Sequence, residues 1–382
     1  MASIAFHDPR LSAVSGGGET VTLQLAEILS QHGHAVTIVT RKGARSGLFQ
    51  SAVNRCPNIN FVEIQLPAEE AWAPMAGELW RSDHLAPLSI MFGDVSRQYY
   101  EQTHFDMVVV SFIPDIWGLP PKTPVLLNVF GLPPDRTIAA VERPLIDRCR
   151  LITFASQFVA ERFGDLFQVD TQALHAQVMH AGINQLFYEL PCEKQAIFEV
   201  CYAGRIEERK GVRTILDAIA RLKEKGKMVR LVMVGEGAEK KALIESSIRL
   251  GIAEQVTWTG AISPEKVRHV LDQSLVFVYP TLKPEAFGCS NLEAMARGVA
   301  VITTNLGGTV DYVQPGENAL TCLPGDPNGL GESIEVLLDN SGLRESLASI
   351  GRATAERFSQ DKMSGRWLSI VENSLLTTHE AV

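Results

Sequence analysis

The sequence lacks any long hydrophobic run, and this absence excludes one class of protein. Within the 382 residues, no apolar stretch reaches the roughly 18 residues that a membrane-spanning helix needs. No signal-peptide pattern is present, and the six cysteines are scattered without a C-x-x-C pair. We therefore expect a protein of the reducing cytoplasm, without disulfides.

The sequence also has no excess of positively charged residues. The net charge is −9, and residues 1–190 hold fewer Lys and Arg than Asp and Glu. This balance argues against nucleic acid as the main partner and gives no support for electrostatic attraction to anionic lipid. A brief contact with a lipid-linked acceptor stays open, and nothing in the sequence indicates an oligomeric state.

The dinucleotide pattern G-x-G-x-x-G does not follow the first strand-like segment, which weakens a nicotinamide or flavin interpretation. The segment "SGGGETV" stands there instead, with Gly16, Gly17 and Gly18 ahead of a helix. A glycine-rich turn at a helix N-terminus suits phosphate, because backbone N–H groups and the positive end of the helix dipole face the ligand. A flexible strand-to-helix turn explains the glycines equally well.

What is present predicts a two-domain α/β protein, since the chain exceeds the usual size of one hydrophobic core. Short β-branched runs alternate with amphipathic helices, which is typical of parallel sheets covered on both faces. We place the linker near Pro191. The predicted domains are residues 1–190, residues 191–362, and a C-terminal helix at 363–382 that packs back on the first domain. The expected strands are "SIAFH", "AVTIVT", "DMVVVSF", "VLLNVF", "LITFAS", "QVMHAG", "FEVCYAG", "VRLVMVG", "QVTWTG", "LVFVYP", "VAVITT" and "ALTC".

An insertion between Leu66 and Leu88 carries Trp72 and Trp80 and shows no clean period. It is a candidate lid or acceptor wall, or alternatively a loop that packs its own aromatic side chains.

Two cations flank a turn in "YAGRIEERKG". Arg205 follows a strand-like run and Lys210 precedes a helix, so both are expected at the carboxyl edge of the second sheet, where doubly wound domains bind ligands. Such cations could stabilise charge on a leaving phosphate. The alternative is a solvated loop, because Glu207, Glu208 and Arg209 lie between them. The strand-to-helix turns at Gly235 ("VGEG") and Ile262 ("TGAI") are weaker candidates for close approach to a ligand.

Two glutamates stand eight residues apart in "EAFGCSNLE". Ser290 and Glu293 match the S-x-x-E capping box, with Gly298 closing the helix, so Glu293 has a structural explanation. Glu285 lies outside the expected helix and has no such explanation. An unpaired carboxylate there could accept hydrogen bonds from sugar hydroxyls.

Taken in order, these segments resemble the family 4 retaining glycosyltransferases of GT-B architecture. The segments that carry the resemblance are "GGGE", "HAGIN", "GRIEERKG", "LVMVGEG", "VTWTG", "EAFGCSNLE" and "GGTVDYV". Each is common alone, whereas their joint order over most of the chain is specific. The resemblance implies two Rossmann-like doubly wound domains that face each other across a deep cleft, with the donor held mainly by the C-terminal domain.

The resemblance also implies roles for single residues. Arg205 and Lys210 correspond to the cations that hold the donor diphosphate, Glu285 to the residue that contacts the donor sugar, and Glu293 to the ribose-binding glutamate. The further donor-binding residues it implies are Gly16, Gly17, Gly18, Gly235, Ile262, Phe287, Gly288, Cys289, Ser290, Asn291 and Leu292.

The implied reaction is metal-independent transfer of a hexosyl group, with retained anomeric configuration, from a nucleoside-diphosphate sugar. The acceptor is a hydroxyl of a saccharide, a lipid-linked sugar or a small molecule, and family frequency favours UDP as the nucleotide. No cofactor is expected.

The chain departs from the family pattern at one place. Many members carry a histidine facing the donor sugar where this chain reads "LLNVFGLPP", with Phe130 or its neighbour in that position and Asn128 nearby. His7, at the end of the first strand, could face the cleft or be structural. The missing histidine leaves room for a partner subunit of low activity. A second alternative, a sugar-nucleotide 2-epimerase, shares the two-domain architecture.

Overall fold

The computed structural model describes residues 1–13, 17–68, 86–132, 142–172, 175–189 and 197–376. The chain divides into two compact units. The first holds Met1–His180 together with Met363–Val382, and the second holds Ala181–Lys362. The predicted linker at Pro191 and the tryptophans Trp72 and Trp80 lie outside the described residues.

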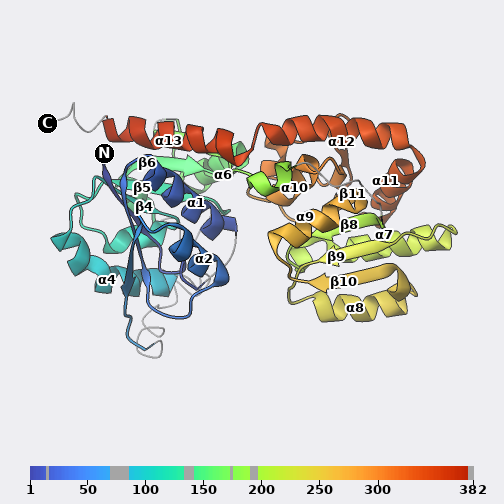
Figure 1. Cartoon of the computed structure of the whole chain (residues 1–382), viewed down its shortest axis with the longest axis horizontal. Helices are drawn as coiled ribbons and strands as arrows, with labels where there is room; N and C mark the ends of the chain where they lie inside the picture. Colours follow the sequence, from blue (N-terminus) through green and yellow to red (C-terminus); the bar gives the residue numbers. More distant parts are fainter. Residues whose placement is uncertain (14–16, 69–85, 133–141, 173–174, 190–196, 377–382) are drawn as a thin grey trace. The chain divides into compact units, whose positions relative to one another are not determined.

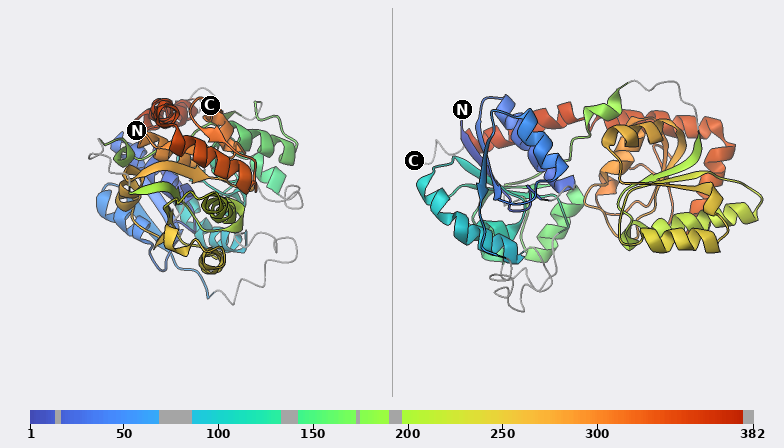
Figure 2. Two further views of the ribbon diagram at one scale, coloured as in Figure 1. Left: turned by 90° about the vertical axis from the view of Figure 1, so that its right-hand side faces the viewer. Right: turned by 60° about the horizontal axis from the view of Figure 1, so that its bottom comes forward.

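The first unit is a parallel sheet with helices on both faces (Figures 1 and 2). The strand order is β3-β2-β1-β4-β5-β6-β7, so the direction of winding reverses between β1 and β4. Its strands are β1 (Ser3–His7), β2 (Ala35–Arg41), β3 (Asn60–Ile64), β4 (Met107–Val110), β5 (Val125–Val129), β6 (Cys149–Phe154) and β7 (Ala176–Val178). Its helices are α1 (Gly17–Gln31), α2 (Gly47–Arg55), α4 (Ala86–Gln102), the 3₁₀ helix η3 (Ile113–Gly118), α6 (Gln157–Phe167) and α13 (Gln360–Leu376).

The second unit repeats this design with the order β10-β9-β8-β11-β12-β13, which reverses between β8 and β11. Its strands are β8 (Phe198–Ala203), β9 (Leu231–Val234), β10 (Val256–Gly260), β11 (Ser274–Tyr279), β12 (Ala300–Thr303) and β13 (Leu320–Thr321). Its helices are η4 (Gln185–Tyr188), η5 (Glu208–Lys210), α7 (Val212–Glu224), α8 (Lys240–Arg249), η6 (Ala253–Gln255), α9 (Pro264–Asp272), α10 (Cys289–Ala296), η7 (Gly308–Asp311), α11 (Pro327–Asp339) and α12 (Ser341–Glu356).

The central strands are buried on both faces, which explains their continuous apolar runs. Every residue of β4, β5 and β12 is buried. Helix α7 shows the complementary pattern, since Ile215, Ile219 and Leu222 are all buried on one face. The two doubly wound parallel sheets confirm the fold class expected from the sequence.

Helix α13 belongs to the first unit from Met363 onward. Figure 1 shows it as the red helix beside β6. Trp367, which is buried, donates a hydrogen bond from Nε1 to the carbonyl of His180 at 3.1 Å. The buried indole and its satisfied N–H fix the helix against the first unit.

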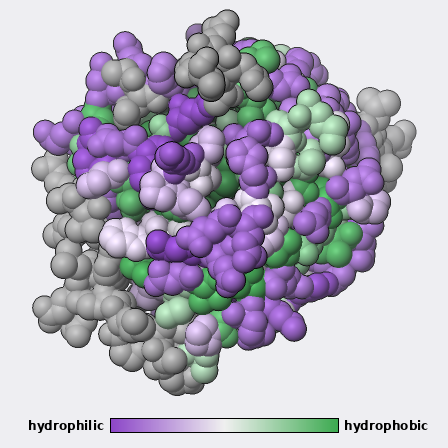
Figure 3. All heavy atoms as spheres, turned by 90° about the vertical axis from the view of Figure 1, so that its left-hand side faces the viewer, coloured by the Kyte–Doolittle hydropathy of each residue, from purple (hydrophilic) through white to green (hydrophobic). Residues whose placement is uncertain are grey.

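The surface shows an ordinary mixture of side chains. On the face of the first unit drawn in Figure 3, hydrophilic residues dominate and hydrophobic ones lie in small patches among them. None of the helices in the described ranges is both long and apolar enough to cross a membrane. The five cysteines that can be described, Cys56, Cys149, Cys201, Cys289 and Cys322, are free thiols.

Candidate active site

The loops after β8 and β11 meet at the switch point of the second sheet. These two strands are neighbours, so their carboxyl ends emerge side by side. The backbone N–H of Leu282 donates to the carbonyl of Arg209 at 2.8 Å and joins the two loops. Gly211 makes this approach possible, because a Cβ there would lie 1.9 Å from the carbonyl oxygen of Pro280. The predicted convergence of Arg205, Lys210 and Glu285 on one edge is confirmed.

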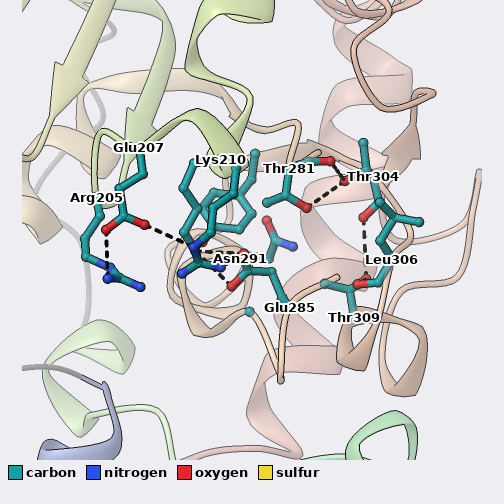
Figure 4. Close-up of polar contacts among 12 residues, drawn as sticks. Arg205, Glu207, Lys210, Thr281, Glu285, Asn291, Thr304, Leu306 and Thr309 are labelled. Atoms are coloured by element: carbon teal, nitrogen blue, oxygen red, sulfur yellow. Dashed lines mark hydrogen bonds and ion pairs between the residues drawn. The ribbon is translucent and has the colours of Figure 1, made fainter. Parts of the chain in front are cut away.

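The Glu285 carboxylate lies at the centre of this edge (Figure 4). Lys210 Nζ is 2.8 Å from each of its oxygens and donates also to the hydroxyl of Tyr279 at 2.6 Å. All three residues are buried. The prediction of an unpaired Glu285 is therefore wrong: the carboxylate accepts from an ammonium whose donors are all committed to Glu285 and Tyr279.

Arg209 extends the pairing toward solvent. It donates from Nη1 to Glu285 at 3.2 Å and from Nε to Glu207 at 3.0 Å. The other oxygen of Glu207 lies 2.8 Å from Nη1 of Arg205, whose side chain is 65% exposed. The interpretation of this turn as a solvated charge run is wrong for Glu207 and Arg209, since both side chains take part in the pairing.

Burial sets the electrostatics of the cluster. It lowers the pKa of the Lys210 ammonium, and the Glu285 carboxylate partly offsets this effect. Burial and the negative charge of Glu285 also raise the pKa of Tyr279 well above its ordinary value. Tyr279 therefore stays a neutral phenol, and the cluster has the charges of three cations and two carboxylates.

A third loop, after β12, holds the backbone of Glu285. The N–H of Gly308 donates to the carbonyl of Glu285 at 2.7 Å. Behind it, Thr281 and Thr304 are joined by their hydroxyls at 3.0 Å, and the Thr304 hydroxyl also donates to the carbonyl of Thr281 at 3.0 Å. The Glu285 side chain is thus fixed by its own ion pairs and by the neighbouring loops (Figure 4).

Glu293 lies in α10, but the predicted capping box is wrong. The N-cap of α10 is Gly288 in a left-handed conformation, and no side chain caps the helix. Ser290 is therefore inside the helix, and Glu293 comes two positions after N3. Gly298, with φ of 63°, follows the helix end as expected. Within the described part of the chain no side chain donates a hydrogen bond to Glu293, and burial raises its pKa to about 7.

The other residues expected at the donor site differ in accessibility. The Phe287 ring is buried and packs edge-on against Tyr312 and Phe358. The Asn291 amide is also buried and donates to the hydroxyls of Thr303 and Tyr312 at 3.1 Å each. Their side chains therefore build the core beneath the site, and only their backbone remains for a ligand.

The remaining members of that set have more varied surroundings. Leu292 is fully buried, whereas Cys289, Ser290 and Ile262 keep partial exposure. Gly235 packs on neighbouring backbone, because a Cβ there would lie 1.8 Å from the carbonyl oxygen of Gly204. The donor-binding role of these residues stays a prediction.

The glycine-rich turn of the first unit is only partly described. Gly16 lies outside the described residues, while Gly17 and Gly18 begin α1. A Cβ at Gly18 would meet nothing within 4 Å, so open space surrounds this position. This geometry fits either a phosphate turn or a flexible connection, as expected from the sequence.

His7 is structural rather than exposed. It is buried, its Nδ1 lies 2.9 Å from the hydroxyl of Tyr100, and burial lowers its pKa to about 3. Asn128, at the place where the family pattern changes, is also buried and hydrogen-bonded to Thr153. Phe130 keeps partial exposure.

A buried ion cluster next to His7 was not predicted. Arg10 lies 2.9 Å from Asp8 and 2.5 Å from Asp115. Burial acts to lower the pKa of Arg10, but the carboxylates of Asp115 and Asp8 raise it by more, so the guanidinium stays charged. The cluster follows β1 at the switch point of the first sheet. The segment "HDPR" gave no signal for it, since Asp115 is distant in sequence.

No group of three or more His, Cys, Asp or Glu side chains suited to a metal ion occurs among the residues that can be described. The expectation of metal-independent chemistry stays a prediction.

Comparison with known proteins adds independent information. A family model described as glycosyl transferases group 1 matches residues 193–354. Another, described as glycosyltransferase family 4, matches residues 15–184. The first match contains the whole Arg205–Lys210–Glu285 cluster.

Curated relatives match over part of the chain. The capsular polysaccharide biosynthesis glycosyltransferase CapM of Staphylococcus aureus is 30% identical over 189 residues, which is 48% of each chain. The 2-deoxystreptamine N-acetyl-D-glucosaminyltransferase of Niallia circulans is 29% identical over 182 residues, or 47% of this chain and 46% of the relative. The chain thus spans about half the length of these curated relatives.

Solved structures match over almost the whole chain. Sucrose-phosphate synthase from Thermosynechococcus elongatus has a TM-score of 0.77 at 21% identity and covers 99% of this chain and 100% of its own. Anabaena HepE, solved in complex with UDP-glucose, has a TM-score of 0.76 at 18% identity, covering 98% and 100%. The two halves of the chain are thus similar to the glycosyltransferase family 4 and glycosyl transferases group 1 domain families, and the whole chain has the GT-B fold.

Proposed function

We propose that the protein is a retaining glycosyltransferase that moves a hexosyl group from a nucleoside-diphosphate sugar, with UDP as the nucleotide, to an acceptor hydroxyl. The observation that carries the proposal is the cluster in which Arg209 and Lys210 pair with Glu285 and Arg205 pairs with Glu207. Three cations against two carboxylates leave one net positive charge at the carboxyl edge of a doubly wound sheet, where such folds bind their ligands.

The relatives support the choice of substrates. HepE was solved with UDP-glucose, and the Staphylococcus aureus protein TarM was solved with UDP and a glycosylated glycerol. CapM is named for capsular polysaccharide biosynthesis. These names favour UDP-sugar donors and a saccharide or small-molecule hydroxyl as acceptor for this chain. A lipid-linked sugar as acceptor and a cytoplasmic site of action stay part of the proposal from the sequence.

Arg205 has the exposure that a phosphate-binding cation needs. Its Nη1 faces Glu207, so the remaining N–H donors of the exposed guanidinium can bind a diphosphate while the pair with Glu207 stays in place. Negative charge builds on the diphosphate as the glycosyl C1–O bond breaks, and a cation already in place stabilises it. Lys210 adds a buried positive charge beside Glu285.

Glu285 is suited to the sugar rather than to the phosphate. Its oxygens accept three hydrogen bonds from Lys210 and Arg209, and the remaining lone pair on Oε2 can accept from a sugar hydroxyl. A fixed carboxylate also stabilises the positive charge of an oxocarbenium-like transition state. The acceptor oxygen forms the new bond to C1 on the face that the diphosphate leaves, and the acceptor proton passes to the departing diphosphate.

Glu293 and the start of α10 complete the proposed donor site. An ionised Glu293 can accept from ribose hydroxyls, and it has no competing hydrogen-bond donor within the described residues. The first backbone N–H groups of α10, at Cys289 and Ser290, are at a helix N-terminus suited to phosphate oxygens. Gly17 and Gly18 of the first unit are proposed as a second phosphate contact.

The two alternative functions expected from the sequence have different support. A sugar-nucleotide 2-epimerase has no support among the relatives described above, since none of their names is that of an epimerase. A partner subunit of low activity remains, because Phe130 or its neighbour stands where many family members have a histidine. Turnover measurements separate these cases.

The test is donor turnover with UDP-, GDP- and ADP-glucose as probes, followed by the configuration of the released or transferred sugar. We expect release of UDP from UDP-glucose with the α configuration retained. Inverted product would refute the retaining mechanism. Epimerised donor without sugar transfer would establish the epimerase instead, and UDP binding without turnover would indicate the partner subunit.

A further inference from the structure

Charges of alternating sign form a continuous chain along the edge of the second sheet. Arg205 pairs with Glu207 at 2.8 Å, Glu207 with Arg209 at 3.0 Å, Arg209 with Glu285 at 3.2 Å, and Glu285 with Lys210 at 2.8 Å. We call these five residues the charge chain. The two ends of the charge chain differ in exposure: the Arg205 side chain is 65% exposed and that of Lys210 is 6% exposed.

Glu207 connects the two ends of the charge chain. One carboxylate oxygen pairs with Arg205 and the other with Arg209, so a single side chain fixes two guanidinium groups. Arg209 in turn contacts Glu285 directly. A change at Glu207 therefore affects both Arg205, the proposed phosphate-binding cation, and Glu285, the proposed sugar contact, which it meets through Arg209.

The stability that Glu207 adds is small, because ion pairs near the surface contribute little to folding. Its charge also opposes the binding of a diphosphate, since it lies beside the cation that the diphosphate would use. A carboxylate that neither stabilises the fold strongly nor attracts the ligand needs another explanation. Its geometry supplies one: it holds a long, flexible and exposed arginine in one place, and donors fixed in advance favour the transition state over the ground state.

We propose that Glu207 is a positioning residue for transfer, acting through Arg205 and Arg209. The inference rests on the proposed function. It predicts that UDP affinity and turnover respond differently when the charge of Glu207 is removed. Loss of the charge removes a repulsion of the diphosphate but releases the two arginines, so UDP binds equally well or more tightly while turnover falls.

The experiment compares Glu207→Gln with Glu208→Gln. Glu208 is exposed in the same turn, and its side chain makes no ion pair or hydrogen bond within the described ranges. Both changes remove one negative charge, so their difference isolates the contacts of Glu207 from its long-range field. UDP affinity is measured by calorimetry, kcat and KM with UDP-glucose as probe, and folding by thermal unfolding.

For Glu207→Gln we expect kcat to fall by about tenfold, with UDP affinity unchanged or higher and the unfolding temperature close to that of wild type. Glu208→Gln should keep kcat within about twofold. The same behaviour in both variants would overturn the inference, and so would a parallel loss of affinity and kcat in Glu207→Gln. Wild-type protein that binds no nucleoside diphosphate would instead overturn the proposed function itself.

A double variant with Arg209→Met gives a second readout. If Glu207 acts partly through Arg209, the two changes break the same connection, and their effects on kcat should be less than multiplicative. Fully multiplicative effects would show that the two residues act independently and would contradict the connected chain.

Discussion

Replacing Lys210 with Met should remove the ammonium that contacts both oxygens of the Glu285 carboxylate. Lys210 and Glu285 are both buried, so the variant leaves a charged carboxylate largely out of water. Methionine fills a similar volume, which keeps the loss of packing small. The expected effect on folding is therefore mainly electrostatic.

The structure indicates the magnitude. Removing one partner of a buried ion pair costs about 3–5 kcal/mol. Arg209 still reaches Glu285 at 3.2 Å, so the lower end of that range, about 3 kcal/mol, applies to Lys210→Met. Removing both charges in Lys210→Met/Glu285→Gln should cost less than the sum of the two single changes, with a coupling of at least about 1 kcal/mol.

The assay is urea unfolding at pH 7 of the wild type, both single variants and the double variant. The midpoint and slope are compared so that changes in the unfolded state are recognised. The matched control is Lys240→Met, which removes a lysine whose partner Glu236 is largely exposed and should change stability by less than about 1 kcal/mol. A coupling near zero would refute the claim that Lys210 and Glu285 form a tight buried pair.

Three further results are expected. Glu285→Gln should lower kcat with UDP-glucose by at least about tenfold, because its remaining amide cannot offer the same charge to the transition state; near-normal turnover would remove Glu285 from the mechanism. The pKa of Glu293, raised from 4.5 to about 7 by burial, means that the folded state binds the proton more tightly. Wild type should therefore lose about 1–3 kcal/mol of stability relative to Glu293→Gln as pH rises from about 4.5 to 7, a difference that unfolding at pH 5 and pH 8 measures. Treatment with EDTA should leave turnover intact, whereas strict dependence on added Mg²⁺ or Mn²⁺ would indicate a different design.

The sequence predicted most of the fold because the central strands are buried on both faces. Continuous apolar runs such as those of β5 and β12 follow directly from that burial. Strand β3 was missed, since "NFVEI" lies at the sheet edge and is only partly buried, so its composition is mixed. An edge strand has one unpaired side and less need for apolar residues.

The sequence predicted where the candidate site lies, but not which of its side chains are in contact. Adjacent parallel strands bring their carboxyl ends together, so the positions of Arg205, Lys210 and Glu285 follow from strand order. Whether Glu285 is paired depends on side-chain directions across 75 residues of sequence, which no local pattern encodes. For the same reason, the sequence left a solvated loop open as an alternative for Glu207 and Arg209.

The error at α10 has a local cause. Ser290 and Glu293 fit a capping box, but Gly288 adopts a left-handed conformation with φ of 86° and begins the helix earlier. A glycine can take this conformation at no steric cost. The helix therefore begins before Ser290, and Ser290 and Glu293 no longer occupy the N-cap and N3 positions that a capping box requires. The sequence "FGCSNLE" allowed either start.

The most direct test of the account is a calorimetric titration of UDP into wild type and Arg205→Ala. Among the residues that the structure describes, the exposed Arg205 side chain pairs with Glu207 alone. Its removal should therefore leave the fold intact, while the proposed diphosphate loses its most accessible cation in the cluster. The account predicts that UDP binds wild type and that Arg205→Ala weakens binding at least about tenfold, equivalent to about 1.4 kcal/mol. Equal affinity in the two proteins, or no binding to wild type, would contradict it.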